Sequence, residues 1–181
     1  MKQIIVAGIL LVAASTVWSQ DAKEPSASAS NPVVTAVQQM EQRSAKNLVA
    51  AAEEMPAEKY SYKPTPEQMS FAHLMVHVAE ANNGFCSAIG GEKHEVTLSE
   101  TDSKQTLVGA VKDSFTYCQQ VLDKADDSHL SQNVALFGHD TTRAAALIRL
   151  ASSWADHYGT AAMYLRLNNL LPPSATKSEH K

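Results

Sequence analysis

Hydrophobic residues recur every three or four positions in four segments of this chain, which is the spacing of amphipathic helices. The longest of these segments, 140–171, is expected to form one helix with a wide apolar face. Two prolines follow it at 172–173 and are expected to end the helix. The apolar face consists of Leu147, Leu150, Ala151, Trp154, Tyr158, Ala161, Ala162 and Leu165.

Three earlier segments, 32–54, 70–89 and 103–125, show the same period and are expected to form the other helices. Asn31 suits the cap of the first helix, and the proline after it suits the first helical position. The inner face of that helix is expected to hold Val33, Val37, Met40, Ala45 and Leu48.

No stretch shows sustained strict alternation between apolar and polar residues with hairpin turns at its ends, so almost no sheet is expected. The segment 126–139 is polar and is interpreted as a loop that leads to the fourth helix. Side-chain oxygens at Asp140, Thr141 and Thr142 could cap the first turn of that helix. The fold class predicted by these patterns is all-α, a four-helix bundle.

The ends of the chain differ in composition from the helical part. Residues 1–19 combine Lys2, a short apolar run and small residues near a cleavage point, which is the layout of a secretory signal peptide. A retained N-terminal anchor is the alternative, although the run is short for a bilayer span. The polar segment 20–30 is expected to be a disordered linker, and 175–181 a disordered tail.

The remaining residues, 31–174, have the length of one domain. The formal net charge is -4 at pH 7, and no cluster of basic residues could neutralise several phosphates. Nucleic-acid binding is therefore disfavoured. The signal pattern predicts a periplasmic or secreted protein that has no stable membrane insertion once the signal is cleaved.

Two phrases of the fourth helix carry a family resemblance: D-H-Y-G at 156–159 and M-Y-L-R-L-N-N-L-L-P-P at 163–173. They resemble the last helix of the DinB-like superfamily, in particular its secreted bacterial members. The similarity extends over 31–174 and implies a DinB-like four-helix bundle. It also implies a metal held by one histidine of the second helix and an H-x-x-x-H pair of the fourth.

The resemblance implies that His77, in the phrase H-V-A-E-A-N, is the metal ligand of the second helix, and that His157 is the second histidine of the fourth-helix pair. The sequence departs from the family pattern at the other member of that pair, where Ser153 stands. Imidazole ligands suit a divalent metal such as zinc or nickel.

A third ligand can be sought among the neighbours of these two histidines. His73 lies four residues before His77, so both share one helical face and could chelate one ion. A polar histidine at the end of the bundle is the simpler interpretation of His73. Asp156 could ligate directly, but its resemblance to an acidic residue of the family suggests a supporting role, and Ser153 could line the cavity or bond to its own helix. A site without a third ligand, and without a tightly bound metal, is the remaining alternative.

The two cysteines that follow the signal segment, Cys86 and Cys118, suggest a disulfide in an exported chain. Both lie toward the C-terminal ends of their helices. Neighbouring helices of an up-and-down bundle are antiparallel, so these two ends would lie far apart. The family's long crossover makes some neighbouring helices parallel, so the resemblance makes the pairing feasible. Two separate buried thiols are the alternative.

Two functions of different classes remain open at this stage. The first is a metal-dependent enzyme, because the resembled superfamily includes transferases that use a metal to activate a small thiol. The second is an exported bundle without catalysis, which binds a small molecule or a partner and has lost the metal. The resemblance also leaves both a monomer and a homodimer open, and neither hypothesis names a substrate.

Overall fold

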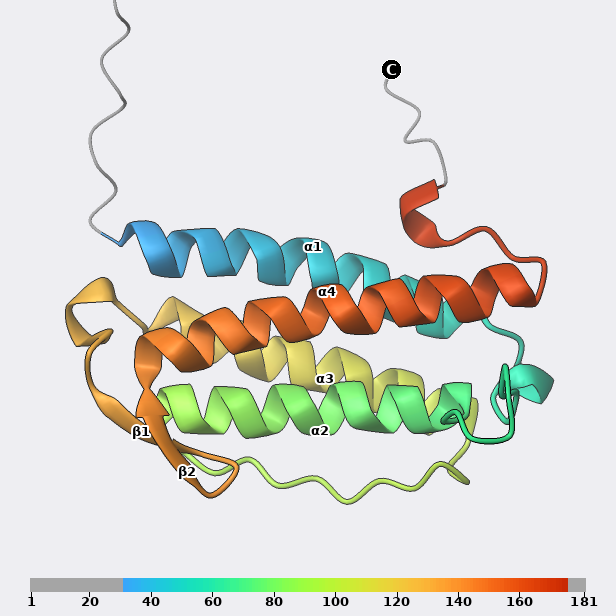
Figure 1. Cartoon of the computed structure of the whole chain (residues 1–181), viewed down its shortest axis with the longest axis horizontal. Helices are drawn as coiled ribbons and strands as arrows, with labels where there is room; N and C mark the ends of the chain where they lie inside the picture. The colour runs from blue at the N-terminus through green and yellow to red at the C-terminus, as the bar shows by residue number, and fades with distance from the viewer. Residues whose placement is uncertain (1–30, 176–181) are drawn as a thin grey trace, which may run out of the picture.

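The computed structural model describes residues 31–175. The expected signal peptide, the linker and all but the first residue of the tail lie outside these residues. Four long helices make up most of the described chain, as predicted (Figure 1). Their bounds are α1 Pro32–Glu54, α2 Phe71–Gly90, α3 Lys104–Asp123 and α4 Arg143–Leu167. Short 3-10 turns stand between and after them: η1 Ala57–Lys59, η2 Asp127–His129 and η3 Pro173–Ala175.

The long connection between α2 and α3 determines the topology of the bundle. Residues 91–103 run back along α2 before α3 begins, so α2 and α3 are parallel (Figure 1). Gly91 allows the chain to leave α2 at this point, because its φ of 78° lies in the left-handed region that glycine adopts without strain. The helices α1 and α4 each pack against the other and against one member of this parallel pair.

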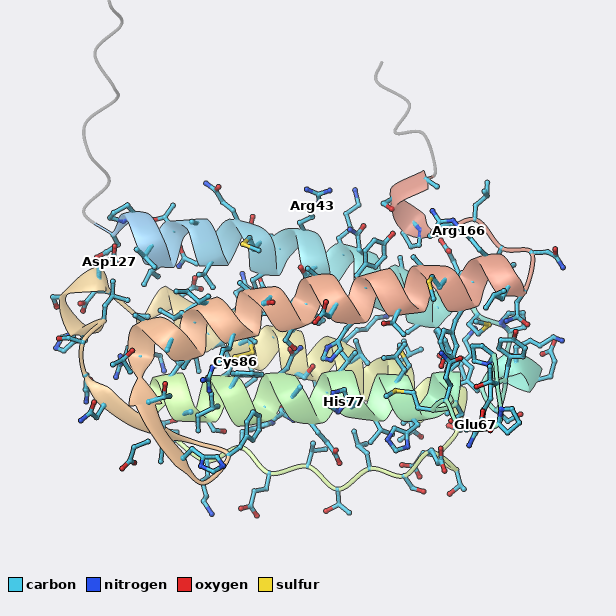
Figure 2. All side chains as sticks on the ribbon, in the orientation of Figure 1. Arg43, Glu67, His77, Cys86, Asp127 and Arg166 are labelled. Atoms are coloured by element: carbon cyan, nitrogen blue, oxygen red, sulfur yellow. A yellow bond between two sulfur atoms is a disulfide. The ribbon has the colours of Figure 1, made fainter. Side chains whose placement is uncertain are left out.

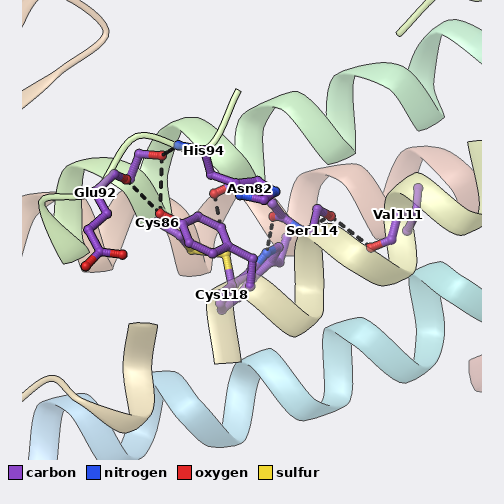
Figure 3. The surroundings of a disulfide bond; sticks show 10 residues. Asn82, Cys86, Glu92, His94, Val111, Ser114 and Cys118 are labelled. Atoms are coloured by element: carbon purple, nitrogen blue, oxygen red, sulfur yellow. Dashed lines mark hydrogen bonds between the residues drawn. A yellow bond between two sulfur atoms is a disulfide. The ribbon is translucent and has the colours of Figure 1, made fainter. Parts of the chain in front are cut away.

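The disulfide predicted between Cys86 and Cys118 is confirmed, and it joins the two parallel helices. Their Cα atoms lie 5.3 Å apart, within the usual range for a disulfide. Around it, Asn82 and Ser114 make a buried side-chain hydrogen bond between the same helices (Figure 3). The tyrosine that precedes the second cysteine, Tyr117, donates to the carbonyl of Glu92 and so holds the start of the crossover.

The predicted apolar face of α4 is buried along its length, apart from the half-buried Tyr158. The prediction for α1 was wrong at two positions, since Val33 and Met40 are exposed. Their neighbours Val34 and Glu41 are buried instead, because the inner face of α1 is rotated by about one residue in its first half.

The expected loop at 126–139 is wrong in part, because it contains the first strand of a hairpin. The strands are β1 Asn133–Leu136 and β2 His139–Thr142, paired antiparallel, with Leu136 opposite His139. Phe137 and Gly138 form the two-residue turn, and both have positive φ, as tight hairpins with right-handed twist require.

The predicted ends of the fourth helix were also wrong. It begins at Arg143, after the hairpin, and only Thr142 of the three expected caps accepts from the first turn, at 3.2 Å from the amide nitrogen of Ala145. The helix ends at Leu167, five residues before Pro172. Asn169 adopts a left-handed φ of 60°, and asparagine tolerates that conformation at a helix end. Within residues 31–175, no helix has the length and apolarity needed to cross a membrane.

Candidate functional site

Two of the predicted histidines meet between α2 and α4. The ring centroids of His77 and His157 lie 4.9 Å apart, and the planes meet edge to face at 78°. His157 is partly buried, whereas His77 is exposed on the outer side of α2 (Figure 2). Of the two rings, only that of His157 is partly enclosed by the core, and the pair lies at the edge of the helix interface.

The packing of each helix explains where the two rings stand. On α2, Val76 and Val78 are buried on either side of His77, which leaves the histidine on the opposite, outward face. On α4, Trp154 is fully buried and lies three residues before His157, so the histidine flanks the core stripe. The apolar neighbours of the two histidines anchor both helices in the core.

The environment of His157 favours an uncharged ring. Burial, together with the repulsion from His77, lowers the pKa of His157 from 6.5 to about 4, while Asp156 opposes this shift. The ring is thus neutral near pH 7, and a neutral imidazole has a nitrogen lone pair available for a metal or a proton donor. The Ser153 hydroxyl lies 3.4 Å from Nδ1 of His157, a long contact from one turn earlier on α4.

The third predicted histidine has a different partner. Nδ1 of His73 lies 3.5 Å from Oε2 of Glu100, and both side chains are about half exposed. The hydroxyl of Ser70 donates to the same carboxylate oxygen at 2.9 Å. Glu100 was not singled out from the sequence, because only the return of the crossover along α2 brings it to the start of that helix.

The donor set fits a divalent transition metal in part. Imidazoles are suitable ligands, and two of them face each other, but tight protein sites commonly use three or more side chains. Among residues 31–175 no three His, Cys, Asp or Glu side chains are grouped closely enough to hold an ion. Asp156 is exposed on α4, and Ser153 offers only a neutral hydroxyl. The ligand roles of His73, His77 and His157 stay predictions.

A buried polar network fixes α2 and α4 close to the histidine pair. The Trp154 indole donates to Oδ1 of Asn82 at 2.8 Å, and Nδ2 of Asn82 donates to the Ser114 hydroxyl at 3.0 Å. All three side chains are at most 1% exposed, so each bond is protected from water. Sequence reasoning missed Asn82, and its only signal was an amide at a core position of the helical pattern.

A comparison with protein-family models finds a match over most of the described chain. The model described as the DinB superfamily covers residues 41–161. This span includes His73, His77 and His157. A comparison with curated proteins found no match to the chain.

Solved structures with a similar fold include two described as DinB-like proteins. One, from Bacillus cereus, is 17% identical with a TM-score of 0.66, and the match covers 77% of this chain and 95% of that one. Another, from Bacillus subtilis, is 20% identical with a TM-score of 0.60 and covers 77% and 92%. A variant of the mycothiol-dependent maleylpyruvate isomerase is 13% identical with a TM-score of 0.57 and covers 70% and 59%. Likeness at these identities shows the fold alone.

Proposed function

This chain belongs to the DinB superfamily, and on that premise we propose its function. We propose that it is an exported protein that binds one divalent transition metal ion at His77 and His157. The observation that carries the proposal is the approach of the two imidazoles, 4.9 Å between ring centroids, from two different helices. The lowered pKa of His157 supports it, since a metal ligand must be unprotonated.

The export part of the proposal rests on two observations. Residues 1–19 have the pattern of a secretory signal, and a disulfide joins Cys86 to Cys118. Disulfides persist in oxidising compartments and are rare in the cytosol of most organisms. The proposed location is therefore the periplasm or the exterior of the cell.

The bound metal would have His77 and His157 as its protein ligands, and would supply a Lewis acid at the edge of the α2–α4 interface. Two protein ligands leave several coordination positions to water or to a small molecule, so binding is expected to be exchangeable. His73 is left out of the proposed set, because its ring lies beside Glu100. Metal chemistry in this place is compatible with an enzyme, but two imidazoles do not define a reaction.

The second candidate is a bundle that binds a small molecule or a partner at this surface without a metal. The contact between Ser153 and His157 favours it, because a hydroxyl stands where the resembled family has a third histidine. In this case the histidine pair would act through hydrogen bonds alone.

Calorimetric titration of the full chain without a histidine tag separates the two candidates. Zinc or nickel is expected to bind saturably, with one site per chain, and His77→Ala or His157→Ala should weaken that site at least about tenfold. His73→Ala is the matched control, from the same exposed face of α2, and should leave the affinity unchanged.

A gain of binding should follow from Ser153→His, because position 153 lies one helical turn from His157 and would supply a third imidazole. We expect at least about tenfold tighter binding. Wild-type protein that binds no more metal than the His77→Ala, His157→Ala double variant would contradict the metal site and leave the second candidate.

A further inference from the structure

A cavity of about 370 Å³ lies on the other side of α4, between this helix and α1. Its lining includes Arg43 and Asn47 from α1, and Trp154 and Tyr158 from α4. A second hollow of about 450 Å³ adjoins it and shares Arg43, Asn47 and the C-terminal Ser174. None of these residues belongs to the histidine pair, which lies between α4 and α2.

The cavity exists because α4 presents little side-chain volume there. Ala151, Ala155 and Gly159 follow one another at four-residue intervals in its lining. A Cβ added to Gly159 would meet no described atom within 4 Å outside its own helix backbone. Trp154 lies at the base of the cavity and is fixed by its bond to Asn82, so the space is not filled by a mobile ring.

The α1 side of the cavity is polar and positively charged. The side chains of Arg43 and Lys46 form no ion pair or hydrogen bond with any residue in the described part of the chain, and Figure 2 shows Arg43 standing out from α1. The only acidic residue in the lining of either hollow is Glu54, in the second one. The two hollows together therefore have two cationic side chains, Arg43 and Lys46, and one carboxylate, Glu54. This excess of positive charge would attract an anion.

The segment after α4 closes one end of this space. The amide of Ser174 donates to the Tyr158 hydroxyl at 2.8 Å, and the amide of Ala175 donates to the carbonyl of Pro172 at 2.8 Å. These bonds hold Ser174 at the edge of both hollows. The cavity is thus built from three separate parts of the chain.

We propose that this cavity binds a small organic carboxylic acid. Its carboxylate would pair with the guanidinium of Arg43, whose planar fork matches a carboxylate, and Asn47 would donate a further hydrogen bond. Its apolar body would lie against Tyr158 and the small residues Ala155 and Gly159, above the buried Trp154. The volume is at the lower end of the range for small-molecule sites, which suits an aromatic or short acyl acid.

Fluorescence gives a local readout, because Trp18 and Trp154 are the only tryptophans of the chain. In the full chain with Trp18→Phe, titration with benzoate, phenylacetate and hexanoate should change the Trp154 emission saturably for at least one acid. The corresponding amides, which lack the charge, should bind at least about tenfold more weakly. Inorganic phosphate tests whether any anion suffices.

Two variants locate the site. Arg43→Gln should weaken acid binding at least about tenfold. Gly159→Leu should abolish it by filling the cavity. Gly109→Leu is the matched control, a glycine inside α3 whose added Cβ also meets nothing, and it should bind as the parent does. Circular dichroism and thermal unfolding confirm that both leucine variants are folded.

The proposal is overturned by any of three results: no saturable response to any of the three acids, equal affinity for acids and amides, or unchanged binding in Gly159→Leu. Phosphate binding tighter than that of every acid would overturn the assignment to carboxylates. None of these outcomes depends on metal binding at His77 and His157.

Discussion

At the scale of single residues, two titratable groups dominate the expected pH dependence of stability. Glu41 is 4% exposed between α1 and α3, and burial, with a smaller effect from the Asp123 charge, raises its pKa to about 7. The pKa of His157 shifts in the opposite direction, because burial lowers it from 6.5 to about 4. Each residue therefore prefers its uncharged form in the folded protein.

The two shifts have opposite consequences for stability. Between pH 4.5 and 7, folding binds a proton at Glu41, so its contribution falls as the pH rises and is lowest above 7. Between pH 4 and 6.5, unfolding binds a proton at His157, so its contribution rises with pH. The two effects partly cancel in the wild type, and a single substitution should reveal either of them.

Glu41→Gln removes the buried charge and should stabilise the protein above pH 7, by up to about 3 kcal/mol from the size of the pKa shift. The gain should largely disappear at pH 4.5, where the wild-type carboxyl is already protonated in the folded state. Urea unfolding of both proteins at pH 4.5 and pH 8 measures the difference. A gap of equal size at both pH values would show that Glu41 does not titrate with this shift.

At the scale of elements, the parallel pair of α2 and α3 depends on contacts near its shared end. The disulfide, the bond from Asn82 to Ser114 and the bond from Tyr117 to Glu92 all lie between these helices or at the start of the crossover (Figure 3). Together they hold a connection that must run the length of the bundle before α3 begins.

Replacing both cysteines, Cys86→Ala with Cys118→Ala, should lower the free energy of unfolding by roughly 3–4 kcal/mol. The estimate follows from the loop entropy for a sequence separation of 32 residues. Urea unfolding with and without reductant provides the measurement. The variant should be insensitive to reductant, whereas the wild type should lose a similar amount of stability when reduced. A loss below about 1 kcal/mol would mean that other contacts suffice to hold the two helices together.

Sequence patterns predicted those features that depend on near neighbours. The helices and the apolar stripe around Trp154 each follow from a few adjacent residues. The disulfide needed the parallel arrangement as well, which came from the family resemblance. The hairpin escaped detection because its strands are only four residues long and Thr142 reads equally well as a helix cap.

Features that depend on distant segments could not be read from local spacing. Glu100 reaches His73 only because the crossover returns along α2. The cavity beside Arg43 requires α1, α4 and the segment at Ser174 together. The exposure of His77 depends on how α2 is rotated about its axis within the bundle. The helical period alone fixes this rotation only to within about one residue.

At the scale of the whole molecule, α4 serves two different surfaces. One side presents His157 to α2, and the adjacent residue Tyr158 lines the cavity beside α1. The Trp154 side chain contacts both regions, because its indole donates a hydrogen bond to Asn82 of α2 and its ring lies at the base of the cavity. The central claim is that the first of these surfaces is a two-histidine metal site.

Nuclear magnetic resonance of the histidine rings during a zinc titration tests this claim most directly. The ring signals of His77 and His157 should shift together and reach saturation at one equivalent of zinc, while those of His73 remain unchanged. Shifts that occur first at His73, His94, His129 or His139, with the signals of His77 and His157 unmoved, would contradict the claim.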